Sequence, residues 1–259
     1  MKINKCLFLL LAISFSYSQI DYSINYEVKL SMDEDDFENN SVNNFENYFD
    51  INLYYKDLYF YSLLKYTNPP LIGSTTNNLK DIFNIFYMDY SNNDLSLTFG
   101  HIYQMYGAGL SMHTFNDRNI DYNNGVFGLD LSYHINDYWN IFGIIGVNEF
   151  KTRTKPDLIE PDIQIDNTLA LGGFSYNYDW FDITYLVSVN QQNINSESII
   201  AMETFANFYG NYLEDRFDDI IPEDYEMLNY ENNLSFNFFL GDMEVSFEKS
   251  WVYYNKIMD

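Results

Sequence analysis

The sequence is poor in cysteine, proline, glycine and basic residues. Its 259 residues include one cysteine, five prolines, 12 glycines and 13 lysines and arginines, against 38 aspartates and glutamates. The formal charge of -25 excludes nucleic acid as a partner held by phosphate neutralisation, because both would be negative. The lone Cys6 excludes a framework of intramolecular disulfides. Beyond the N-terminal region, no apolar run approaches the about 20 residues that a transmembrane helix needs.

Residues 1–18 have the pattern of a secretory signal peptide. Lys2 and Lys5 precede a short apolar run, and Ser16 and Ser18 supply small residues at a cleavage site. Cleavage there would make Gln19 the first mature residue and would remove Cys6, so the exported protein would carry no disulfide. The apolar run is too short for a membrane anchor.

Aromatic residues are abundant, with 25 tyrosines, 22 phenylalanines and three tryptophans, and this argues against a disordered acidic chain. From Gln19 onward, apolar and polar residues alternate. Ile20, Tyr22, Ile24, Tyr26, Val28 and Leu30 face one side of the first segment, and the residues between them are polar. About eleven such segments predict strands at 20–30, 45–56, 58–67, 82–90, 95–102, 127–134, 139–148, 168–178, 181–190, 234–240 and 243–247.

Long and short connections alternate along the whole chain. The short connections are 56–57, 91–94, 135–138, 179–180 and 241–242, and the connections between them run to 14 residues or more. Outer-membrane barrels have this pattern, with short periplasmic turns and long extracellular loops, and their strands have about 9–11 residues. The sequence therefore predicts an all-β, antiparallel transmembrane β-barrel domain over residues 19–259.

The strand count conflicts with a complete barrel. Bacterial barrels have an even number of strands, and the chain ends in Lys256-Ile257-Met258-Asp259 after an eleventh. A miscount or a truncated chain would explain this, and we favour an incomplete barrel, truncated at its C-terminus. An open sheet has two edges that lipid does not tolerate.

Aromatic residues flank the short turns. Tyr138 and Trp139 flank one, Tyr178, Trp180 and Phe181 a second, and Tyr54, Tyr55 and Tyr59 a third. Rings at strand ends form the interfacial girdles of outer-membrane barrels, although tyrosine also favours strands in general.

The segment GHIYQMYGAGLSMHTFNDRNIDYNN, at 100–124, resembles a family of uncharacterised Gram-negative outer-membrane barrel proteins with a G-x-x-Y-x-Q-F-G-x-G-L block followed by R-x-x-x-x-D-N. The residues that carry the resemblance are Gly100, Tyr103, Tyr106 (in place of Phe), Gly107, Gly109 and Leu110, and then Arg118 and Asn123 or Asn124 at a shifted spacing. The resemblance implies a barrel that continues beyond residue 259, and no established activity.

The same segment offers a candidate constriction. Gly107 and Gly109 permit positive φ or a close approach of the backbone, so they mark either a bend at the rim or a loop that folds inward. An inward loop would carry a set of polar residues to a constriction: Tyr103, Asp117, Arg118 and Asp121. Arg118 would pin the loop through Asp117 or Asp121.

Residues for catalysis or metal binding are scarce. His101, His113 and His134 lack the spacing of a zinc site, and the acidic clusters 33–36 and 214–219 lack that of a calcium loop. No nucleophile motif is present, so we expect no enzyme and no cofactor. In the longest loop, apolar residues at helical spacing over 196–220 predict an amphipathic helix, which would lie on the barrel mouth, plug the barrel or bind a partner.

If the apolar side of each strand faces lipid, seven acidic residues line the lumen: Asp21, Glu27, Asp50, Asp130, Asp182, Glu244 and Glu248. Lys29 and Lys56 are the main counter-charges. Such a lumen would concentrate cations and pass a small solute. Two alternatives stay open: a non-conducting barrel whose loops bind a partner or saccharide, and a secreted, soluble β-sandwich that binds carbohydrate.

Overall fold

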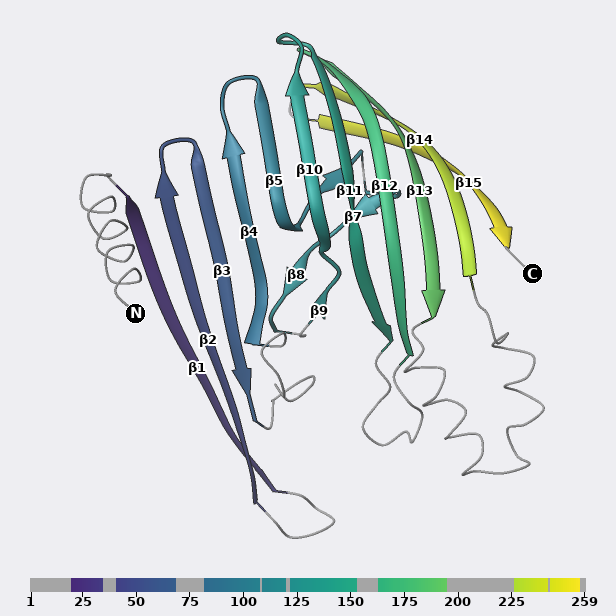
Figure 1. The fold of residues 1–259 in the computed structure, drawn as a ribbon. Coiled ribbons are helices and arrows are strands. Elements are labelled where there is room, and N and C mark those ends of the chain that lie inside the picture. The colour runs from purple at the N-terminus through teal and green to yellow at the C-terminus, as the bar shows by residue number, and fades with distance from the viewer. Residues whose placement is uncertain are drawn as a thin grey trace, which may run out of the picture. The chain divides into compact units, whose positions relative to one another are not determined.

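A computed structural model describes residues 20–34, 41–68, 82–107, 109–119, 122–152, 163–194, 226–241 and 243–256 (Figure 1). The predicted signal peptide (1–18), the predicted helix (196–220) and Asp121 lie outside these ranges. The strands are β1 (Asp21–Glu34), β2 (Ser41–Tyr55), β3 (Leu58–Thr67), β4 (Phe83–Ser91), β5 (Leu95–Ile102), β6 (Met105–Tyr106), β7 (Met112–His113), β8 (Asn116–Asp117), β9 (Tyr122–Asn123), β10 (Val126–His134), β11 (Trp139–Thr152), β12 (Ile163–Tyr178), β13 (Phe181–Ile194), β14 (Glu226–Leu240) and β15 (Met243–Lys256).

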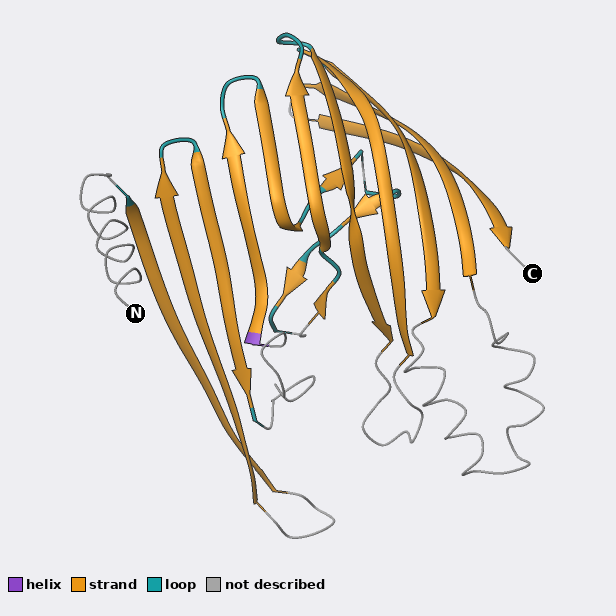
Figure 2. Cartoon of the chain, in the orientation of Figure 1, coloured by secondary structure: helices purple, strands orange, loops and turns teal. Residues whose placement is uncertain are grey.

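The eleven long strands are antiparallel, and their hydrogen-bonded order is their order in the sequence. Strands make up most of the described part of the chain (Figure 2). All eleven predicted strands are present, so the all-β prediction is confirmed. The order begins at β1 and ends at β15, and the described residues contain no pairing that closes a barrel. Among the described residues, the order therefore has two end strands, β1 and β15.

Several strands are longer than the alternation predicts. β14 begins at Glu226 instead of residue 234, and β12 begins at Ile163 instead of residue 168. Their early residues do not keep the alternation of the later ones, since Met227 and Leu228 are adjacent in β14 and Asp166, Asn167 and Thr168 are all polar in β12. Backbone pairing nevertheless continues, as between Asn193 and Glu226.

The short turns are built from local polar chemistry. In the turn between β4 and β5, the Asn92 Oδ1 atom accepts hydrogen bonds from the backbone N–H groups of Asp94 and Leu95, at 3.0 and 2.8 Å. Asn136 does the same for Tyr138 and Trp139 between β10 and β11, both at 2.9 Å. Asparagine side chains commonly close turns in this way, so the sequence itself fixes these hairpins.

The chain divides into two compact units: residues 1–101 with 117–121, and residues 102–116 with 122–259. In the first unit, β1 to β5 are consecutive hydrogen-bonded neighbours. In the second, β10 to β15 are consecutive neighbours. Residues directly opposite in an antiparallel pair share a face, so the registers define an apolar and a polar face in each unit.

The apolar face is the exposed one. In the first unit it carries Ile24, 53% exposed, and Leu30, 73% exposed; in the second it carries Ile145, 60% exposed. The polar face carries buried hydrophilic residues, among them Glu46, Asp50 and Lys65 in the first unit and Asn148, Glu231 and Asn233 in the second. Water-soluble sheets have the opposite arrangement.

The second unit also has an apolar cluster on its polar face. It consists of Ile102, Met112, Val126, Phe142, Ile144, Leu169, Leu171 and Leu186, with Tyr106 packed against it. Ile102 ends β5, Tyr106 and Met112 come from the connection that follows it, and the other residues belong to β10–β13. The cluster is therefore the core between this connection and the sheet of its own unit.

Candidate functional site

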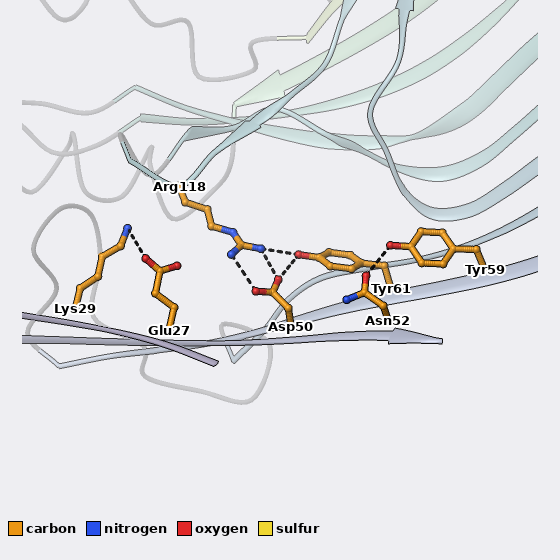
Figure 3. Close-up of polar contacts among 7 residues, drawn as sticks. All are labelled: Glu27, Lys29, Asp50, Asn52, Tyr59, Tyr61 and Arg118. Carbon is orange, nitrogen blue, oxygen red and sulfur yellow. Dashed lines mark hydrogen bonds and ion pairs between the residues drawn. The ribbon is translucent and has the colours of Figure 1, made fainter. Parts of the chain in front are cut away.

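Arg118 is the centre of a polar cluster in the first unit (Figure 3). Its Nη1 atom donates to Asp50 Oδ2 at 3.1 Å, and its Nη2 atom donates both to Asp50 Oδ1 and, at 2.6 Å, to the Tyr61 hydroxyl. Tyr61 in turn donates its own proton to Asp50 Oδ1 at 2.5 Å. Asp50 lies on β2 and Tyr61 on β3, so the contacts fasten the 117–119 segment to the polar face of that unit's sheet.

The cluster is largely sheltered from water. The side chain of Asp50 is 12% exposed and that of Arg118 is 28% exposed, and the guanidinium carbon lies 5.7 Å from the centre of the Tyr48 ring. Burial by itself lowers the pKa of Arg118, but the hydrogen bonds that it donates to Asp50 and the negative charge of Asp50 outweigh it and raise that pKa. Arg118 therefore stays protonated. Its two hydrogen bonds to the Asp50 carboxylate form a bidentate contact, the strongest geometry between a guanidinium and a carboxylate.

The structure pairs Arg118 with Asp50 on β2 and not with Asp117, one of the two predicted partners. The other predicted partner, Asp121, lies outside the described residues. Asp117 has a local role instead, because its Oδ1 accepts the backbone N–H of Asn119 at 2.9 Å.

A row of tyrosines continues from this cluster across the same face of the first unit. Tyr54 and Tyr59 stack with ring centroids 4.7 Å apart, Tyr59 meets Tyr87 at 5.8 Å, and Tyr87 meets Tyr61 at 5.1 Å. We call these four residues the tyrosine ladder. The Tyr59 hydroxyl donates to Asn52 Oδ1 at 2.8 Å (Figure 3).

The tyrosine ladder corrects the girdle prediction at the β2–β3 turn. Tyr54 and Tyr59 are paired opposite each other, and alternation places them with Asp50 and Asn52 on the polar face. They are therefore not part of an outward-facing band. Tyr55, one residue on, lies on the apolar face with Leu58.

In the second unit, aromatic residues do gather at the short turns. Trp139 contacts Tyr176 at 4.9 Å, Tyr138 contacts Tyr178 at 5.8 Å, and Trp180 contacts Phe181 at 4.6 Å. Trp139 and Tyr176 are a cross-strand pair on the apolar face. The contacts agree with an aromatic band there.

The segment 105–113 is tied to β14 and β15 of its own unit by two glutamates. The Ser111 hydroxyl donates to Glu231 Oε1 at 2.6 Å, and the Leu110 N–H donates to Glu248 Oε2 at 3.2 Å. Glu231 also accepts from Ser250 on β15. These contacts join residues far apart in sequence, which fixes the segment over the polar face.

Tyr106 anchors the start of the same segment. Its ring stacks on Phe142 with centroids 4.2 Å apart, and its hydroxyl donates to Asp130 Oδ1 at 3.2 Å. Burial, with the charge of Asp130, raises the pKa of Tyr106, so the hydroxyl remains a proton donor.

The paired glycines behave as predicted. Gly107 has φ of 63° and Gly109 has φ of 95°, both in the left-handed region. A Cβ atom at Gly107 would lie 2.7 Å from Glu248 Oε1 and 3.0 Å from Ser235 Oγ. Gly107 thus provides both the turn and the close approach to the sheet.

The predicted constriction residues are divided between the units. Tyr103 belongs to the second unit, where its hydroxyl donates to Asn123 Oδ1 at 3.1 Å, and Gly107 and Gly109 lie in the segment tied to Glu248. Asp117 and Arg118 belong to the first unit.

The seven predicted lumen residues lie on the polar faces of their units, by strand register. Asp21, Glu27 and Asp50 share that face in the first unit, and a second set shares it in the second: Asp130, Asp182, Glu244 and Glu248. Asp50 and Asp130 are buried under tyrosine and arginine contacts. On the polar face, the Lys29 Nζ atom lies 3.8 Å from Glu27 Oε1. Lys56 was placed wrongly, because it occupies the β2–β3 turn and lies over the Tyr55 ring.

The sequence prediction missed Glu231 and the apolar cluster. A signal was present in Leu186, which interrupts the polar positions Asp182, Thr184, Ser188 and Asn190 and is fully buried. An apolar residue on an otherwise polar face indicates that another part of the chain covers it.

Within the described ranges, no group of three or more His, Cys, Asp or Glu side chains is placed to hold a metal ion. No helix in the same part of the chain is long and apolar enough to span a membrane.

Comparison with known proteins identifies a family and no activity. No curated protein matches the sequence. The family model that matches covers residues 1–216, and by that match the chain belongs to DUF6029, a family of unknown function.

Proposed function

We propose that this protein is an outer-membrane β-barrel protein whose acidic polar face lines a narrow, cation-preferring pore. The observation that carries the proposal is the inverted polarity of the sheet. Large apolar side chains are exposed along whole strands, and hydrophilic side chains are buried on the opposite face. Lipid is the solvent that favours this arrangement.

The exposed apolar surface is continuous within each unit. In the first, β1 exposes Tyr22, Ile24, Tyr26, Val28 and Leu30 in alternate positions. In the second, exposed pairs recur on neighbouring strands: Leu129 and Leu131, Ile145 and Val147, Val187 and Val189. Soluble monomers rarely expose contiguous apolar patches beyond a few hundred Å².

Insertion into a bilayer imposes a condition on the edges. β1 and β15 are the end strands of the described sheet, and unpaired backbone groups do not face hydrocarbon. The proposal therefore requires both strands to gain a backbone partner in the membrane, from other residues of the protein or from a second copy.

A substitution on the apolar face shows whether that face contacts lipid or water. Ile145→Arg should lower the free energy of unfolding in lipid by about 2–4 kcal/mol, the cost of arginine near the bilayer midplane. In water, arginine at the same exposed position should change the free energy of unfolding by no more than about 0.5 kcal/mol. The matched control is Asp137→Arg, in an exposed turn, which should be silent in either solvent. Equal, small effects of both substitutions on the protein in its own membranes would overturn the proposal.

Cation preference follows from the charge of the polar face. In the second unit this face carries five carboxylates by register: Asp130, Asp182, Glu231, Glu244 and Glu248. Negative rings of this kind select cations. Reversal potentials of the full-length protein in asymmetric KCl should therefore show cation preference, and anion preference would contradict it.

A second function, a non-conducting barrel that presents binding loops, is favoured by the apolar cluster. Tyr106 and Met112 fill part of the polar face of their unit with packed side chains, and a packed interior does not conduct. Absence of conductance, together with a heat-modifiable band in the outer-membrane fraction, would select this function over the pore. A soluble band that heat does not shift would indicate a secreted binding protein.

We propose no enzymatic role, because the buried carboxylates are held by structural contacts: Asp50 by Arg118, Asp130 by Tyr106 and Glu231 by serine hydroxyls. Assays of the purified protein against ester and glycoside substrates should show no turnover.

A further inference from the structure

The tyrosine ladder has exposed ring surface on a polar face. Tyr54 is 47% exposed, and Tyr59, Tyr61 and Tyr87 are half-buried. The four rings are in continuous contact over β2, β3 and β4. Tyr54 is exposed and the other three rings keep part of their surface accessible, so the ladder presents aromatic surface beside polar groups.

Hydrogen-bonding groups border the ladder. The Asn52 side chain accepts a hydrogen bond from the Tyr59 hydroxyl, and the Tyr61 hydroxyl is hydrogen-bonded to both Asp50 and Arg118 (Figure 3). Asp89 is paired directly opposite Tyr59 in the β3–β4 register. The Asp89 Oδ1 atom is buried and accepts no hydrogen bond within the described residues.

An acceptor left without a donor in this way costs on the order of 1–3 kcal/mol. The Oδ1 atom has almost no solvent-accessible surface, so a ligand donor reaches it only when a neighbouring side chain moves aside, and Asp89 is a polar group beside the ladder rather than an open acceptor.

We infer that the tyrosine ladder is a binding site for a neutral saccharide. A pyranose ring has flat C–H faces that pack on aromatic rings and a rim of hydroxyls that both donate and accept. The ladder supplies the aromatic surface, and Asp89 and Asn52 supply polar partners at its edge. Asp50 is already neutralised by Arg118, which favours an uncharged ligand over a cation at that end. This inference goes beyond the pore, and saccharide binding can be measured whether or not the protein conducts.

The first test separates the contribution of the aromatic ring of Tyr59 to binding from that of its hydroxyl. The full-length protein, folded in detergent and checked by circular dichroism, is titrated calorimetrically with maltohexaose, cellohexaose and chitohexaose. Tyr59→Leu should weaken binding at least tenfold, and Tyr59→Phe, which keeps the ring, should stay within about threefold. Tyr176→Leu is the matched control, since Tyr176 lies in the aromatic group on the apolar face of the other unit, and it should bind as the unaltered protein does.

The second test separates a saccharide from an organic cation. Asp89→Asn keeps an acceptor oxygen and should retain saccharide binding within about threefold, whereas Asp89→Leu should weaken it at least tenfold. Choline serves as the cationic probe. Binding of choline alone, with loss in Asp89→Asn, would overturn the inference. Failure of all three oligosaccharides to bind, or binding unaffected by Tyr59→Leu, would also overturn it.

Discussion

The contact between Arg118 and Asp50 gives the most direct test of how the connection after β5 is held. Replacing each residue by alanine, singly and together, isolates the coupling energy of the pair in a double-mutant cycle. The structure sets the expected size. The guanidinium makes two hydrogen bonds to one carboxylate, and the two side chains are 28% and 12% exposed.

Exposed ion pairs are worth about 0–1 kcal/mol, and breaking a buried pair costs about 3–5 kcal/mol. The Arg118–Asp50 pair lies between these limits, so we expect a coupling of about 2 kcal/mol, equivalent to about 30-fold in the folding equilibrium. Urea unfolding of the protein in detergent, followed by tryptophan fluorescence, measures each corner of the cycle.

The Glu27–Lys29 pair of the same unit is the matched comparison. Its single contact is 3.8 Å long, and its side chains are 49% and 27% exposed. We expect its coupling to be about 0.3 kcal/mol. A coupling for Arg118–Asp50 no larger than that of Glu27–Lys29 would refute the reasoning that shelter from water and bidentate geometry make this contact strong.

Three further predictions concern the turns and the 105–113 segment. Gly107→Ala should cost about 1–2 kcal/mol of stability, since alanine is strained at a φ of 63° and its Cβ would displace Glu248; thermal unfolding measures this. Glu231→Leu should release the segment from the sheet, because it removes the acceptor of the Ser111 hydroxyl, and limited proteolysis should then cut between residues 104 and 114 faster than in the unaltered protein. Asn136→Ala should cost about 1 kcal/mol by leaving two backbone N–H groups of the turn without their acceptor, whereas Asn136→Asp, which keeps an acceptor, should cost less than half as much in the same urea assay.

The sequence by itself determined the strands and the turns that join them. Period-two alternation is a local property, so the sequence neighbours of Ile24 or Val187 indicate which face of the sheet each occupies. Asn92 and Asn136 likewise close their turns by accepting hydrogen bonds from residues two and three positions away. Positive φ at Gly107 and Gly109 is equally local, since no other residue type adopts it so cheaply.

Tertiary structure decided what the connection between β5 and β10 contacts. Arg118 has carboxylates nearer in sequence, yet its partner is 68 residues away, because β2 presents a sheltered oxygen pair beside Tyr61. Ser111 and Leu110 reach glutamates more than a hundred residues away. Alternation states which face Asp50, Glu231 and Tyr59 lie on, but the contacts of that face depend on how the chain returns over it. Such long-range contacts have no periodic signal in the sequence, and they produce the held segment.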